Sequence, residues 1–123
     1  MHKLLSWFKQ HFQSLPADYE ARMPDLPQFN PAAAVIRQHL IFTGRVQGVG
    51  FRFQSTLIAQ KLGLTGWVKN LTDGSVEMEV QGPEDKVAFF KKCLKKRPPI
   101  IVAQIKSQDL KTIAKEKEFK ALY

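Results

Sequence analysis

The sequence predicts an α+β fold in which two helices cover one face of an antiparallel sheet. Short runs of β-branched and aromatic residues alternate with two longer segments of helical periodicity. The second and third of these runs are joined by Asp73-Gly74, a pair typical of tight hairpin turns. The third run, Ser75 to Gln81, alternates strictly between apolar and polar residues, as a strand with one buried face does.

Local start and stop signals define the first half of this pattern. A first strand is expected over Arg37 to Arg45, and a helix follows over Phe51 to Leu62 before a stop at Gly63. A second strand is expected over Thr65 to Leu71, directly ahead of the hairpin turn. In the third strand the apolar residues are expected to be buried and the polar residues to face solvent.

The second helix is predicted to open at Gly82-Pro83-Glu84-Asp85. Proline suits the first turn of a helix, and two carboxylates there oppose the positive end of the helix dipole. Lysines gather toward the other end, which is the sign that the dipole favours, and Pro98-Pro99 ends the helix. Its expected buried stripe is Val87, Phe90 and Leu94.

Two further strands complete the pattern. In the fourth, Ile101, Ala103 and Ile105 are expected on one side. A closing strand is expected over Glu118 to Tyr123. The sequence does not determine the register of this strand, because Ser107 to Lys117 is polar and weakly patterned. The order βαββαβ plus a terminal strand is that of a ferredoxin-like split β-α-β sandwich. We expect its first and second strands to lie side by side at the centre of the sheet.

Composition and charge limit the classes of function that this chain can have. A chain of 123 residues with 44% apolar residues suits a globular protein with one modest core. One cysteine excludes an internal disulfide framework and fits a reducing, cytoplasmic location. The net charge is +8, and residues 37–123 carry all of it, with 16 basic against 8 acidic residues. Such a surface suits a small phosphorylated substrate, and equally RNA or an anionic membrane.

Residues 1–36 are interpreted as an N-terminal extension of a domain that covers residues 37–123. Lys3 to Leu15 has the apolar periodicity of an amphipathic helix, and Pro16 to Pro31 has the prolines of a linker. Two accounts of the helix stay open. It packs on its own domain or is partly disordered, or it docks on a membrane surface or a partner protein.

The stretch from Gly44 to Arg52 joins the first strand to the first helix and contains three glycines. Glycine permits positive φ and lets another molecule approach the backbone closely. Peptide N–H groups at a helix start have no internal partner, and the dipole there favours an anion. Arg52 adds a planar fork of donors suited to phosphate. A tight turn whose glycines serve packing alone is the other interpretation.

Conventional catalytic sets and metal sites are not evident. His2, His11 and His39 lack the spacing of metal ligands, and a strand histidine such as His39 is more often structural. Cys93 has no identifiable activating base and is expected to be inert. Glu77 and Glu79 share one exposed strand face without contrasting environments. We therefore expect neither a metal nor a cofactor.

Three blocks of sequence together resemble the acylphosphatase family. They are Val46-Gln47-Gly48-Val49-Gly50-Phe51-Arg52, Gly66-Trp67-Val68-Lys69-Asn70 and Asp73-Gly74-Ser75-Val76-Glu77. The resemblance runs from about Arg37 to Tyr123 and implies the same split β-α-β fold. It also implies hydrolysis of small acyl phosphates, with Arg52 binding phosphate and Asn70 holding the attacking water. Lys69 is expected to be an exposed neighbour.

The chemistry of acyl phosphates fits this assignment. The leaving group is a carboxylate, so the protein has to hold the phosphoryl group, stabilise its charge and aim a water in line. Main-chain N–H groups are expected to hold the phosphoryl oxygens, together with the Arg52 guanidinium. These phosphate-binding residues are Gln47, Gly48, Val49, Gly50, Phe51 and Arg52. The expected products are a carboxylate and inorganic phosphate.

Two alternatives stay open at this point. The domain can bind phosphate or acyl phosphate as a non-catalytic accessory module. It can also be a basic RNA-binding sheet, although the aromatic string of RNA-binding βαββαβ domains is missing, so no nucleic acid is expected. For Asn70, a turn-forming role ahead of Asp73-Gly74 is the simpler alternative.

Overall fold

A computed structural model of the chain describes residues 26–123. These residues form, in order, β1 (Val35–Arg45), α2 (Phe51–Lys61), β2 (Thr65–Asn70), β3 (Val76–Pro83), α3 (Glu84–Leu94), β4 (Ile101–Leu110) and β5 (Phe119–Leu122). The predicted order of elements is confirmed. The largest difference in bounds is at β4, which continues through the polar residues up to Leu110 because they pair with β1.

The sheet has the strand order β4-β1-β3-β2-β5. Neighbouring strands are antiparallel except β2 and β5, which run parallel, so the sheet is mixed rather than wholly antiparallel. The expectation that β1 and β2 lie side by side is wrong. The crossover through α2 leaves a gap one strand wide, and the β2–β3 hairpin folds β3 into it, where β3 pairs with both strands.

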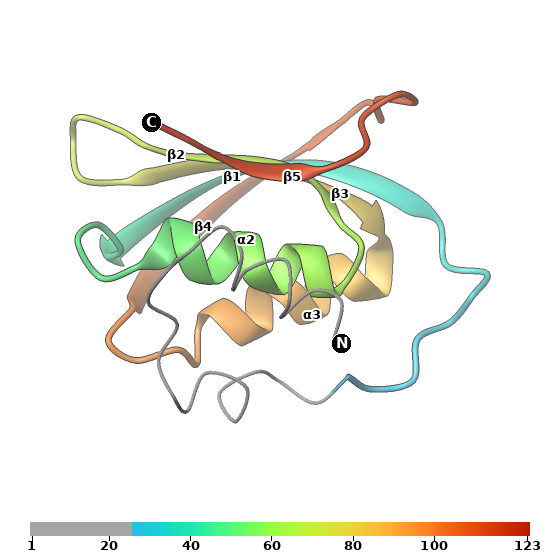
Figure 1. Cartoon of the computed structure of the whole chain (residues 1–123), viewed down its shortest axis with the longest axis horizontal. Coiled ribbons are helices and arrows are strands. Elements are labelled where there is room, and N and C mark those ends of the chain that lie inside the picture. Colours follow the sequence, from blue (N-terminus) through green and yellow to red (C-terminus); the bar gives the residue numbers. More distant parts are fainter. Residues whose placement is uncertain (1–25) are drawn as a thin grey trace, which may run out of the picture.

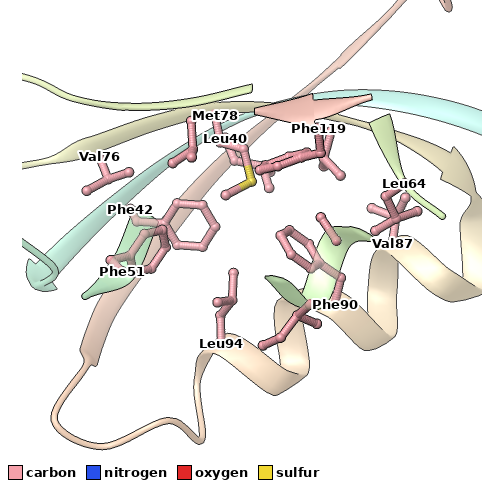
Figure 2. Close-up of a cluster of buried hydrophobic side chains, with 14 of the residues drawn as sticks. Leu40, Phe42, Phe51, Leu64, Val76, Met78, Val87, Phe90, Leu94 and Phe119 are labelled. Carbon is pink, nitrogen blue, oxygen red and sulfur yellow. The ribbon is translucent and has the colours of Figure 1, made fainter. Parts of the chain in front are cut away.

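Helices α2 and α3 lie on the same face of the sheet, as Figure 1 shows. The hydrophobic core fills the space between the two layers (Figure 2). The third strand contributes its apolar face as predicted, because Val76, Met78 and Val80 are fully buried. The predicted stripe of α3 is likewise buried and comprises Val87, Phe90 and Leu94.

A bulge in β4 changes the side chains that this strand turns inward. Its pairing with β1 shifts register between Thr43 and Gly44, which leaves Ala103 without a direct partner. Val102 and Ile105 therefore pack against the core, whereas Ile101 is 59% exposed. The predicted alternation of the fourth strand was wrong for this reason. In β5, Phe119 is buried as expected, but Tyr123 follows the strand and is exposed.

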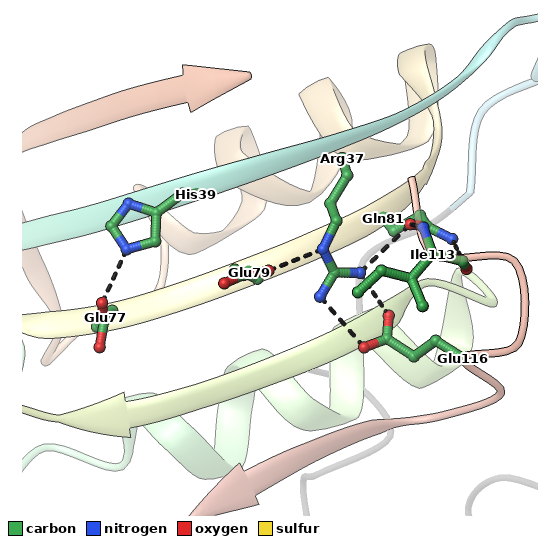
Figure 3. Close-up of polar contacts among 7 residues, drawn as sticks. All are labelled: Arg37, His39, Glu77, Glu79, Gln81, Ile113 and Glu116. Carbon is green, nitrogen blue, oxygen red and sulfur yellow. Dashed lines mark hydrogen bonds and ion pairs between the residues drawn. The ribbon is translucent and has the colours of Figure 1, made fainter. Parts of the chain in front are cut away.

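The other face of the sheet is covered by paired charges around Arg37. The Arg37 side chain is 2% exposed, and its Nε donates to Glu79 Oε1 at 2.8 Å. Its two terminal nitrogens donate to the carboxylate of Glu116 at 2.7 and 3.2 Å (Figure 3). Gln81 forms two hydrogen bonds with the main chain of Ile113, at 2.7 and 2.9 Å. These contacts fasten the segment between β4 and β5 to the sheet, so the outer polar residues of β3 are only partly solvated.

The residues just ahead of β1 also pack on the domain. The Phe29 ring meets Phe89 of α3 edge-on with centroids 5.7 Å apart, and the Asn30 N–H donates to Asp85 at 2.8 Å. The division of the chain at residues 36 and 37 stays a prediction. The predicted amphipathic helix and most of the predicted linker lie outside the described residues.

Candidate active site

The loop between β1 and α2 turns through two left-handed glycines, Gly48 with φ 72° and Gly50 with φ 80°. A Cβ placed on either glycine would meet no heavy atom within 4 Å, so the space beside this backbone is open. Gly50 is also the N-cap of α2, which has no side-chain cap and no acidic residue in its first turn. Among the described residues, no side chain therefore caps the positive end of the helix, where the N–H groups of Phe51 and Arg52 can meet an anion.

Three apolar side chains fix this loop to the core. Val46 and Phe51 are 1% and 2% exposed, and Val49 packs partly against the same cluster. The Phe51 ring lies 4.9 Å from that of Phe42. Since the Phe51 side chain is buried in the core, only its main-chain N–H can serve a ligand. The loop is thus a rigid main-chain surface rather than a flexible tip.

Arg52 reaches from the first turn of α2 to the far end of β5. Its Nη1 donates to the main-chain oxygen of Leu122 at 3.0 Å, and its guanidinium carbon lies 4.2 Å from the centre of the Tyr123 ring. Within residues 26–123 the guanidinium forms no ion pair with a carboxylate. One carbonyl and one ring thus hold the side chain in place while its charge stays available for an anionic ligand.

Asn70 is the last residue of β2, on the helix-bearing side of the sheet. Val68, two residues earlier, is fully buried beneath the helices, and strand alternation puts Asn70 on that same side. Lys69 points to the opposite face and lies 3.4 Å from a Glu77 carboxylate oxygen. Lys69 is also the partner of Leu122 in the parallel β2–β5 pairing. The anchor of Arg52 therefore lies alongside the end of β2.

Gln47 connects the loop to the turn that follows Asn70. Its Nε2 donates to the main-chain oxygens of Leu71 and Ser75, at 2.7 and 2.8 Å. The turn is closed by a hydrogen bond from the Leu71 N–H to the Ser75 oxygen at 2.9 Å. Hydrogen bonds from the Ser75 hydroxyl and N–H lower the pKa of Asp73 in the same turn. Turn and loop are therefore tied together through one side chain.

The predicted site residues thus come from three places that meet at one end of the sheet. These are the loop with Gln47, Gly48, Val49, Gly50 and Phe51, the start of α2 with Arg52, and the end of β2 with Asn70. Among the described residues no hydrogen bond joins Arg52 directly to Asn70. Sequence reasoning missed Leu122, Tyr123 and the side chain of Gln47, and no local pattern marks these contacts.

The other reactive side chains lie elsewhere. Burial raises the pKa of the half-buried Cys93 thiol, against the effect of nearby cations, which disfavours a thiolate nucleophile. His39 Nε2 lies 2.8 Å from a Glu77 carboxylate oxygen on the outer face of the sheet (Figure 3). Residues 26–123 contain no group of three or more His, Cys, Asp or Glu side chains placed to hold a metal ion. In this same region no helix is both long and apolar enough to cross a membrane.

Comparisons with known proteins agree on one family. The family model described as acylphosphatase matches residues 38–121. An acylphosphatase of Clostridium beijerinckii is 47% identical over 90 residues, which is 72% of this chain and 100% of that protein. One of Trichormus variabilis is 46% identical over 79 residues, 64% of this chain and 78% of that protein.

A solved structure gives the same result. The crystal structure of acylphosphatase from Bacillus subtilis superimposes with a TM-score of 0.67 at 36% sequence identity. The match covers 72% of this chain and 99% of the other. The residues that the family model matches include the loop, α2 and the end of β2.

Proposed function

This chain belongs to the acylphosphatase family, and we propose that it hydrolyses the carboxyl–phosphate anhydride of small acyl phosphates to a carboxylate and inorganic phosphate. The observation that carries the proposal is the open, uncapped helix start behind Gly48 and Gly50, with a guanidinium in its first turn that pairs with no carboxylate among residues 26–123. Such a surface binds a tetrahedral anion through main-chain donors.

In this proposal the loop holds the phosphoryl group. The N–H groups from Gln47 to Arg52 donate to its oxygens, and the absence of side chains at Gly48 and Gly50 leaves room for it. Donors that are already in place need no reorganisation as charge develops in the transition state. Each such donor typically contributes about 3 kcal/mol to transition-state stabilisation.

Arg52 supplies the positive charge in this proposal. Its guanidinium offers several donors in one plane, and the bond to Leu122 uses only one of them. The guanidinium also lies over the exposed Tyr123 ring, which favours its positive charge. The remaining donors can therefore meet a phosphoryl group bound at the loop.

Asn70 positions the attacking water. A carboxamide both accepts and donates hydrogen bonds, so it can orient a water without changing its own charge. The leaving carboxylate is a weak base that needs no general acid, and water can attack the phosphorus directly without forming a phosphoenzyme. The same leaving-group chemistry makes a metal unnecessary in this mechanism.

Benzoyl phosphate hydrolysis tests the proposal. The full-length protein should hydrolyse benzoyl phosphate in the presence of a chelator, with competitive inhibition by inorganic phosphate. Arg52→Ala should lose both the activity and the inhibition while keeping its thermal unfolding transition. If benzoyl phosphate is hydrolysed no faster with the wild-type protein than in buffer alone, the proposed hydrolase activity is ruled out.

The accessory-module alternative is not favoured. The chain covers nearly the whole length of relatives that are themselves named acylphosphatase, 100% of one and 99% of another. Phosphate binding without hydrolysis in the assay above would support that alternative. The absence of a nucleic-acid partner, the cytoplasmic location and the docking of the N-terminal helix stay predictions.

A further inference from the structure

The Gln47 side chain has an orientation that its surroundings determine. Its carboxamide end faces two carbonyl oxygens, those of Leu71 and Ser75. With the amide reversed, its own oxygen would face both carbonyls without a hydrogen between them, so only the Nε2 group fits. An amide nitrogen has two hydrogens, and each is used here. The Gln47 side chain therefore has no donor left for a phosphoryl group.

The two acceptors are saturated as well. The Leu71 oxygen also receives the Gly74 N–H at 3.3 Å, and the Ser75 oxygen also receives the Leu71 N–H at 2.9 Å. Each carbonyl thus accepts two hydrogen bonds, which is the capacity of its lone pairs. Within residues 26–123, Gln47 is the residue whose side chain links the phosphate loop to this turn.

This link fixes the position of Asn70. Asn70 directly precedes Leu71, the first residue that Gln47 holds, and it pairs with Val76, which directly follows Ser75, the second. The Gln47 carboxamide therefore holds both the end of β2, where Asn70 lies, and the start of β3, where its partner Val76 lies, at a set distance from the loop. A small change in that distance would move the water relative to the phosphorus, and misplacement by about 1 Å can cost about 100-fold in rate.

We propose that the Gln47 side chain is a positioning residue that sets the distance between the phosphate loop and Asn70. The proposal rests on the proposed function of this loop and adds a role that the main-chain N–H of Gln47 does not have. Phosphate binding depends on the loop and Arg52, whereas turnover depends on these and on Asn70 as well. Loss of the link should therefore lower kcat and spare phosphate affinity.

Gln47→Met is the decisive variant because it keeps the length of the side chain and removes both donors. The control is Gln81→Met, on the other face of the sheet, which also removes two hydrogen bonds to a loop main chain, together with one that Gln81 accepts from Arg37. We expect kcat for benzoyl phosphate to fall at least tenfold in Gln47→Met. The Ki of inorganic phosphate should stay within about twofold of wild type. Gln81→Met should keep both parameters.

Gln47→Glu adds a pH profile that loss of stability alone does not produce. A carboxylate facing two carbonyl oxygens is disfavoured, so the pKa of the introduced acid should rise above its ordinary value of about 4.3. Its protonated form can donate one of the two lost hydrogen bonds. The ratio of variant kcat to wild-type kcat should therefore increase as the pH falls from about 7 to about 5.

The outcomes separate this proposal from the function itself. Wild-type turnover establishes the hydrolase, whatever the variants do. The positioning role is overturned if Gln47→Met keeps kcat within about twofold of Gln81→Met, or if phosphate Ki rises as much as kcat falls. If Gln47→Met has no cooperative unfolding transition, Asp73→Ala decides, because Asp73 is exposed and braces the same turn from within. Lower kcat with unchanged Ki supports the role, and unchanged kcat overturns it.

Discussion

The Arg52 guanidinium donates to the main-chain oxygen of Leu122 at 3.0 Å, across a separation of 70 residues. A single hydrogen bond therefore sets the direction of the one cation in the first turn of α2. The bond joins the start of a helix to the final strand of the sheet, and both lie at the end where β2 stops.

Arg52→Lys should lose most of the activity although the positive charge remains. Lysine has no planar fork, so it cannot hold the Leu122 oxygen and a phosphoryl oxygen in the same geometry. We expect kcat/KM for benzoyl phosphate to fall by about 10- to 1000-fold with little change in melting temperature. Lys69→Ala is the control, since Lys69 lies beside Asn70 but faces the opposite side of the sheet. Equal losses in the two variants would argue against a directed role of Arg52.

Asn70→Ala should separate turnover from binding. It removes the group proposed to orient water, and it leaves the loop donors intact. We expect kcat to fall by about 100-fold or more while phosphate Ki stays near the wild-type value. Asn70→Asp places a negative charge beside the phosphate, so its Ki should increase as well. Retention of kcat in Asn70→Ala would assign Asn70 to the turn alone.

Gly66→Ala should mainly lower stability and Gly48→Ala should mainly weaken phosphate inhibition, although both glycines have positive φ. A Cβ on Gly66 would lie 1.9 Å from the Glu79 main-chain oxygen, whereas a Cβ on Gly48 would meet nothing within 4 Å. Gly66→Ala has to separate β2 from β3, and we expect a loss of more than about 3 kcal/mol in the free energy of unfolding. Gly48→Ala carries about 1 kcal/mol of backbone strain and should mainly weaken phosphate inhibition. Denaturant unfolding and inhibition assays distinguish the two, and similar stability losses would contradict the prediction.

Acid should weaken the Arg37–Glu116 pair. Burial opposes ionisation of Glu116, but hydrogen bonds and charge from Arg37 outweigh it, so the pKa of Glu116 is lowered below its ordinary value. A lowered folded-state pKa contributes stability that is complete above the unfolded value and lost as the pH falls through the folded value. Glu116→Gln should cost about 2 kcal/mol at pH 7, and the difference from wild type should shrink below about pH 4. Glu118→Gln is the exposed control, and a difference that is independent of pH would contradict this account.

Local sequence signals predicted which helices and strands form, but they did not predict which strands lie next to each other in the sheet. The Asp73-Gly74 pair determines the β2–β3 hairpin, and the alternation of β3 determines which of its faces is buried. The second partner of β3 depends on contacts distant in sequence, so the placement of β3 between β1 and β2 had no local signal. The bulge opposite Gly44 likewise interrupts the predicted alternation of β4. The backbones approach so closely at Gly44 that an added Cβ would lie 2.2 Å from the Ile101 oxygen, so the position has no room for a side chain.

In the candidate site too, the sequence predicts some of the features and not others. Three glycines ahead of a helix and an arginine in its first turn are readable in the sequence, and the resemblance to a family adds Asn70. The contact of Arg52 with Leu122 and the two hydrogen bonds of Gln47 link segments 70, 24 and 28 residues apart. Such contacts follow from the tertiary arrangement, so side chains that orient the site were not predicted.

The parallel pairing of β5 with β2 gives the last strand a role in the geometry of the site as well as in the sheet. Leu122 is opposite Lys69 in this pairing, and the Leu122 oxygen is also the acceptor for Arg52. A slip of β5 by two residues along β2 would keep Phe119 on the core side and the edge strand paired, but it would move that acceptor by about 6.6 Å. Variants of the segment ahead of β5 can therefore retain a folded sheet and still inactivate the enzyme through altered strand register.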